Sequence, residues 1–172
     1  MWEKLTDKKA REVITKVGDP FKGLPHLPQY LIDFFVKITP WGVALGAFFS
    51  LTGAITNLRW GLGLSPLSKV MSFYTGVNPL YFLLSATLQL AIAAIAFKAF
   101  GLLRKLKMEG WIYLFWSNTI ALLEAALGFI FLGGSGVGLL IGALIGYYFL
   151  FEIKPAYGPK TKKIDSKKKK DK

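Results

Sequence analysis

The sequence predicts an all-α integral membrane protein, a four-helix bundle with N-terminal interfacial amphipathic helices. Mean hydropathy is +0.42 and 53% of the 172 residues are hydrophobic, which is too apolar for an ordinary soluble domain. Mostly apolar stretches approach the roughly 20 residues that a helix needs to cross a bilayer. Four such stretches follow one another, at about 41–58, 80–100, 111–132 and 136–152. Together they predict one transmembrane domain over 41–153.

The distribution of lysine and arginine predicts the orientation. The segment before the first stretch carries seven of these residues, the second loop with its flank four, and the region from Lys154 nine. The first loop carries two and the third none, which leaves 20 of the 22 on one side. The positive-inside rule then predicts that both termini are cytoplasmic and that the number of spans is even. We interpret the net charge of +12 as a feature that sets the membrane topology and attracts anionic lipid headgroups, and we expect no nucleic acid partner.

The flanking segments are basic. Residues 1–20 suit either an amphipathic helix at the membrane surface or a solvated arm. Residues 24–40 have an apolar side, and we expect them to lie in the interface and lead into the first span at Pro40. A short interfacial helix is expected at 67–74. The Lys-rich tail, 154–172, is expected to be disordered.

Small residues recur every fourth position in two of the stretches, so they form stripes along one helix face. Inside a bilayer such stripes permit close backbone approach, whereas in a soluble helix each glycine costs about 1 kcal/mol relative to alanine. We therefore expect them to pack closely against another helix, with the Glu124 face of the third stretch meeting the later stripe. The predicted packing positions are Gly42 and Gly46 in the first stretch, and Gly134, Gly138, Gly142 and Gly146 at the last.

Glu124 is the candidate functional residue, because an acidic side chain well inside a hydrophobic stretch is costly. Counted from the outer ends, Glu124 and Gln89 lie at a similar depth, about 12 Å at the ~1.5 Å rise of a helix. We expect the two side chains to meet. Their contact is either a packing bond between helices or, together with Asn118, part of a polar path for a proton or a cation.

Other chemistry is sparse. The chain has no cysteine and one histidine, His26, which we interpret as a surface residue, so no metal or cofactor site is predicted. The glycine-rich run at 133–138 lacks the Lys and Ser/Thr of a phosphate-binding loop and is interpreted as a turn. No catalytic residue is predicted, and we expect the protein not to be an enzyme.

Short motifs at the expected membrane boundaries carry a resemblance. They are PHLP at 25–28, PW at 40–41, EGW at 109–111 and IGALIGYYFLFEIKPAY at 141–157. With these the chain resembles a family of small four-span inner-membrane proteins from bacterial small-genome lineages, over most of residues 24–157. The resemblance implies the four-span fold and no catalytic residue.

Two function classes remain at this point. The first is a structural or interaction protein that packs through its glycine seams with itself or with a larger membrane assembly. The second is a small proton- or cation-linked transporter or channel using Glu124. Four short spans leave little room for a solute path in one copy, so transport would need an oligomer.

Overall fold

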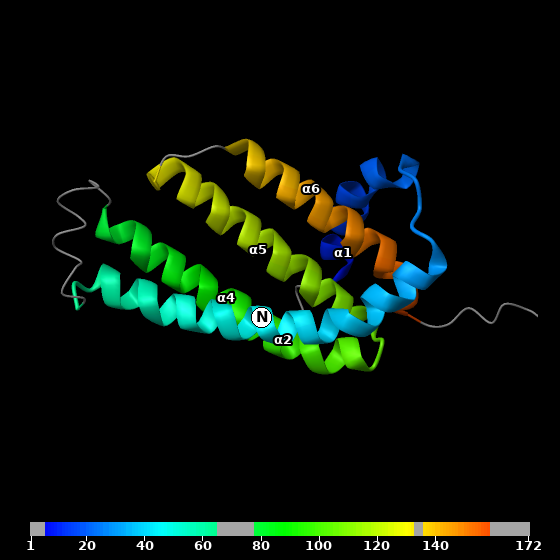
Figure 1. Cartoon of the computed structure of the whole chain (residues 1–172), viewed down its shortest axis with the longest axis horizontal. Coiled ribbons are helices and arrows are strands. Elements are labelled where there is room, and N and C mark those ends of the chain that lie inside the picture. The colour runs from blue at the N-terminus through cyan, green and yellow to red at the C-terminus, as the bar shows by residue number, and fades with distance from the viewer. Residues whose placement is uncertain (1–5, 65–77, 133–135, 159–172) are drawn as a thin grey trace, which may run out of the picture.

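A computed structural model describes residues 6–64, 78–132 and 136–158, and these ranges contain helices and no strand. Four long helices lie side by side, and α1 crosses one end of them (Figure 1). The elements are α1 (Lys8–Gly18), η2 (Asp19–Gly23), α2 (Gln29–Gly61), α4 (Pro79–Arg104), α5 (Met108–Leu132), α6 (Gly136–Ile153) and η3 (Lys154–Ala156). The helix expected at 67–74, Gly134 and residues 159–172 of the expected tail lie outside the described residues. The prediction of disorder is wrong for the start of that tail, because Lys154–Ala156 form η3 and Tyr157 is buried in the hydrophobic core.

Three of these helices are long and apolar enough to cross a membrane: α2, α4 and the Met108–Phe131 part of α5. Large apolar side chains such as Phe48, Phe97 and Ile130 are exposed along them, as expected of surfaces that face lipid. The predicted all-helical, multi-pass architecture is therefore confirmed at this level. The helix α6, with 18 residues, is not among the three.

Local sequence explains where the helices begin. Asp7 caps α1, because its carboxylate accepts a hydrogen bond from the Ala10 N–H at 2.8 Å. Asn78 caps α4 in the same way through the Leu80 N–H, at 2.9 Å, and Pro79 follows at the first helical position.

The start of the first span differs from the sequence prediction. One helix, α2, runs from Gln29 to Gly61 and continues through Pro40, where we expected an interfacial segment to give way to a span. Proline removes one backbone hydrogen bond, and a buried position against neighbouring helices can compensate. Pro40 is buried in the structure. The first turns of α2 slant away from the axis of the rest (Figure 1).

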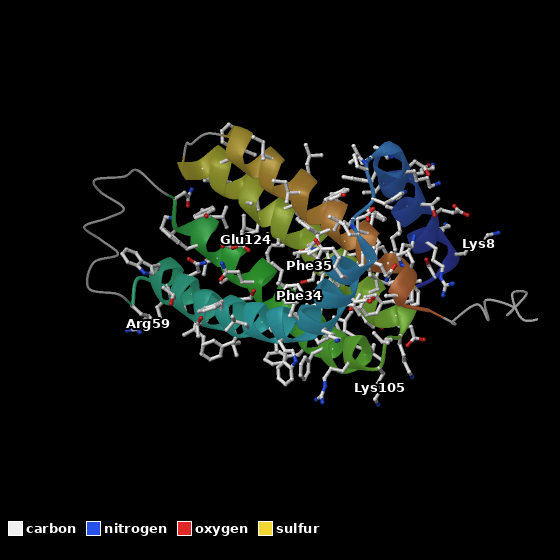
Figure 2. All side chains as sticks on the ribbon, turned by 45° about the vertical axis from the view of Figure 1, so that its right-hand side comes forward. Lys8, Phe34, Phe35, Arg59, Lys105 and Glu124 are labelled. Atoms are coloured by element: carbon white, nitrogen blue, oxygen red, sulfur yellow. The ribbon has the colours of Figure 1, made fainter. Side chains whose placement is uncertain are left out.

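The helices pack unevenly. The helix α4 packs extensively against both α2 and α5, whereas α6 makes far fewer contacts with its neighbours. Arg59 lies at one end of the molecule, and Lys8 and Lys105 lie at the other (Figure 2). We call the second end the basic end.

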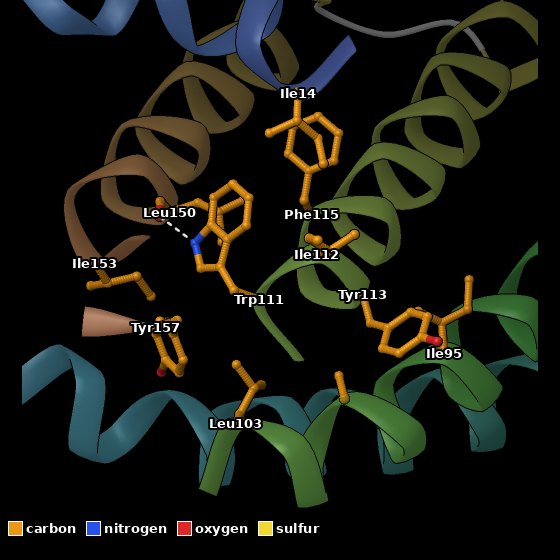
Figure 3. Packing of buried hydrophobic residues seen from close by; sticks show 11 residues of the cluster. Ile14, Ile95, Leu103, Trp111, Ile112, Tyr113, Phe115, Leu150, Ile153 and Tyr157 are labelled. Carbon is orange, nitrogen blue, oxygen red and sulfur yellow. Dashed lines mark hydrogen bonds between the residues drawn. The ribbon is translucent and has the colours of Figure 1, made fainter. Parts of the chain in front are cut away.

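A hydrophobic cluster closes the basic end (Figure 3). Trp111 is fully buried in it, and its indole N–H donates to the Leu150 carbonyl at 2.8 Å, which ties α5 to α6. Ile14 of α1 belongs to the same cluster. Within the described part of residues 1–20, the structure has the helix α1, whose Ile14 side contacts protein; its placement at a membrane surface stays a prediction.

Candidate functional site

Glu124 forms the centre of a polar network that joins three helices. Its Oε1 atom accepts hydrogen bonds from Ser85 Oγ at 2.6 Å and from Gln89 Nε2 at 2.5 Å, both on α4. The predicted meeting of Gln89 and Glu124 is confirmed. Asn57 of α2 extends the network, because its Nδ2 donates to Ser85 Oγ at 3.1 Å. The donated protons all run toward the Glu124 carboxyl group.

The backbone of α2 is shaped to hold this network. A Cβ atom at Gly53 would lie 2.5 Å from Gln89 Oε1, so a side chain there would displace the amide from Glu124. Ser85 is 2% exposed, and Gln89 Oε1 is buried with no hydrogen-bond partner among the described residues. The network therefore acts as a tie between α2, α4 and α5, since its bonds run from helix to helix.

Asn118 does not join Glu124, although both lie on α5. Its side chain is exposed, and no hydrogen bond joins its amide to another described residue. It lies instead where two adjoining grooves meet, and both grooves are lined by Asn118 and Ala121. The predicted path through Gln89, Glu124 and Asn118 is thus divided between two different faces of α5.

The two grooves make one open surface that we call the glycine cleft. The groove between α5 and α6 has a volume of about 300 Å³, and the groove between α2, α4 and α5 about 380 Å³. The cleft brings together glycines that are distant in sequence. Gly138, Gly142 and Gly146 line the first groove, and Gly42 and Gly46 line the second.

Within the described chain no helix packs closely against these five glycines, so the expected contact of the α6 stripe with the Glu124 face of α5 is not formed. A Cβ atom at any of the five would meet no atom of the described residues within 4 Å. Bulky side chains explain the separation of α6 from α5, because Tyr147 stands between them. Its hydroxyl lies 2.8 Å from Thr119 Oγ1, and its ring packs on Phe115 at 5.6 Å between centroids.

Other glycines provide the close contacts within the chain. A Cβ atom at Gly110 would lie 2.7 Å from the Leu103 backbone nitrogen, at the corner between α4 and α5. A Cβ atom at Gly61 would lie 2.6 Å from Leu83. Neither glycine belongs to a four-residue repeat, so the spacing in the sequence did not reveal them.

A second polar cluster lies at the basic end, and sequence reasoning missed it. Glu152 is 8% exposed; its Oε1 pairs with His26 Nδ1 at 2.9 Å and its Oε2 accepts the Leu27 N–H at 2.9 Å. Tyr148 donates to the Pro25 carbonyl at 2.5 Å. His26 is 74% exposed, so its interpretation as a surface residue is confirmed, but its pairing with Glu152 was not predicted. The one signal in the sequence was an acidic residue, Glu152, at the end of a hydrophobic stretch. That signal could not identify His26 as the partner, because the two residues are 126 positions apart.

The fold and these sites define the class: a multi-pass helical membrane protein whose polar side chains join helices. Among the described residues, no group of three His, Cys, Asp or Glu side chains could hold a metal ion. A scan of protein-family models and searches of curated proteins and of solved structures found no match. The resemblance drawn from the sequence motifs stays a prediction.

Proposed function

We propose that the chain is a structural or interaction protein of the bacterial inner membrane that associates with a second copy of itself through the glycine cleft. In this proposal α6 is a fourth span and both termini are cytoplasmic, as the charge distribution favours. The observation that carries the proposal is the exposure of both glycine stripes. Gly42 and Gly46 on α2, and Gly138, Gly142 and Gly146 on α6, have open space beside them.

The physics of helix association in lipid supports this use of the cleft. Apolar surface alone gives little drive for association there, because lipid tails are as apolar as leucine. Close backbone approach and interhelical hydrogen bonds supply the drive instead, and the cleft offers both. Its glycines admit a helix closely, and the exposed Asn118 amide is a hydrogen-bonding group that lipid tails cannot satisfy.

A second copy is the partner that fits this surface most simply. The chain carries two stripes of the same spacing on helices that border one cleft. A stripe on one copy can therefore lie against a stripe on the other, as a two-fold symmetric interface requires. The same arrangement places the two Asn118 amides on the shared surface.

The Glu124 network supports this role over proton- or cation-linked transport. Its hydrogen bonds run to Ser85 and Gln89, so the carboxyl group is engaged in helix packing. A relay uses several ionisable groups along one route, and the described interior of the spans offers Glu124 alone. We propose no catalytic role for it.

The test is the oligomeric mass of the purified full chain in a mild detergent, measured by light scattering. We expect wild type to be a dimer and Gly142→Leu to be a monomer that keeps its helix content, because the leucine would fill the cleft while its Cβ meets no described atom of its own chain within 4 Å. Gly101→Leu is the control, since Gly101 also has open space beside it but lies outside the cleft. A monomeric wild type, or a dimeric Gly142→Leu variant, would contradict the proposal.

A further inference from the structure

A small pocket at the basic end is formed by two parts of the chain that are far apart in the sequence, residues 15–26 and 151–154. Its volume is about 170 Å³, and it lies between the end of α1, the turn η2 and the end of α6. Phe21 and Phe151 form an apolar wall, with their rings stacked at 5.5 Å between centroids. Lys22, His26 and Lys154 provide positive or protonatable groups around it. An adjoining pocket of about 220 Å³ shares Lys154 and adds Arg11.

The cations of this pocket lack a strong anionic partner. Lys154 lies over the rings of Trp111 and Phe151, at 5.1 and 5.6 Å from their centroids, which fixes its ammonium group in place. No carboxylate among the described residues pairs with it. Burial lowers the pKa of Lys154, and the nearby charge of Lys22 lowers it further.

The two acidic side chains nearby are already engaged. Glu152 also lines the pocket, but its two oxygens bind His26 and the Leu27 N–H. Asp19 pairs with Lys22 at 2.7 Å, and both side chains are more than half exposed, so the pair contributes little and can rearrange. An incoming anion would therefore meet two lysines whose mutual repulsion it relieves.

We propose that this pocket binds the phosphate group of an anionic phospholipid, held between Lys22 and Lys154. The site goes beyond the self-association proposed above, because the glycine cleft contributes no residue to it. The compact ammonium group of a lysine binds phosphate as a point charge. Basic pockets at the cytoplasmic ends of transmembrane helices are suited to binding the headgroups of anionic lipids.

The position of the pocket favours a lipid over a soluble phosphate. Lys154 directly follows the last residue of α6, and Trp111 lies in the first turn of α5, so the ammonium group is at the level where spans end. The Phe21 and Phe151 wall then offers apolar contact to the glycerol and the first carbons of an acyl chain. A soluble phosphate would make no use of this wall.

Native mass spectrometry of the full chain in a neutral detergent tests the proposal, with phosphatidylglycerol as the anionic probe and zwitterionic phosphatidylcholine, whose net charge is zero, as the reference. We expect tighter binding of phosphatidylglycerol. The double change Lys22→Gln and Lys154→Gln should weaken that binding at least tenfold, since each lysine near an anionic lipid contributes about fivefold. Lys22→Gln alone, at an exposed side chain that leaves the Trp111 contact intact, should weaken it about fivefold.

The matched control is the double change Lys8→Gln and Lys9→Gln. It removes the same charge from exposed positions of α1 that do not line the pocket. Figure 2 shows Lys8 pointing away from the helices. Equal losses in the two double variants would mean diffuse attraction and would overturn the site. Equal binding of both lipids by wild type, or full displacement of the lipid by inorganic phosphate, would overturn the lipid assignment.

Discussion

Replacing Glu124 tests whether its network holds the helices together. In Glu124→Leu, Ser85 Oγ and Gln89 Nε2 lose their shared acceptor while remaining packed between helices. Interhelical hydrogen bonds in membranes contribute about 0.6 kcal/mol on average and up to ~1.7. Two lost bonds therefore predict a decrease of about 1–3 kcal/mol in the free energy of unfolding. Glu124→Gln keeps an acceptor oxygen of nearly the same shape, so we expect a change below about 0.5 kcal/mol.

The assay is reversible unfolding in mixed micelles, with helix content followed by circular dichroism. Asn118→Leu is the matched control, because it removes a polar side chain from the same helix where no described hydrogen bond is lost. It should leave the unfolding of the monomer unchanged. If Glu124→Gln costs as much as Glu124→Leu, then the protonatable group itself matters and the packing interpretation is refuted.

Two further predictions concern the basic end. Gly110→Ala should destabilise the fold by about 1–3 kcal/mol, because its Cβ would lie 2.7 and 2.9 Å from the backbone atoms of Leu103 and Leu102, which cannot move aside cheaply. Gly101→Ala, which meets nothing within 4 Å, should be neutral or stabilising in the same thermal melts, and equal effects of the two changes would refute the reasoning. Burial raises the pKa of the Tyr157 hydroxyl from 10.0 to about 12. The neighbouring Thr39 hydroxyl offsets only part of this rise in pKa, since its own proton is donated to the Phe35 carbonyl. The folded state therefore holds this proton after the unfolded state has released it. Stability should fall by about 2–3 kcal/mol as pH rises from 10 to 12, and Tyr157→Phe should abolish that fall; a fall of the same size in the variant would contradict the assignment.

The helices could be predicted from the sequence because their signals are local. The length of the apolar stretches and their flanking charges predicted the bounds of the three later helices to within a few residues. In the structure these helices are Pro79–Arg104, Met108–Leu132 and Gly136–Ile153. The contact between Gln89 and Glu124 was also predictable, since depth along two antiparallel helices follows from counting residues. Pro40 misled the prediction because tertiary burial of the helix outweighed the local preference of proline.

The remainder depended on contacts between distant residues. Trp111 is fully buried, and its indole N–H is bonded to a carbonyl 39 positions away, a contact that no local pattern in the sequence indicates. The pairing of His26 with Glu152 spans 126 positions. A glycine stripe shows that a helix can be approached closely, but its spacing does not tell whether the partner is in the same chain. At Gly142 the described part of the chain supplies no such partner.

Cross-linking between copies in native membranes tests the glycine cleft most directly. The chain has no cysteine, so single cysteines can be placed at Ala121, inside the cleft, and at Leu123, which is 53% exposed on the same helix and does not line it. A bifunctional thiol reagent that spans about 10 Å, one helix diameter, reports adjacent copies. We predict a cross-linked dimer from Ala121→Cys that disappears when Gly142→Leu is added, and little product from Leu123→Cys. Equal products at both positions, or a dimer that persists with Gly142→Leu, would contradict the account.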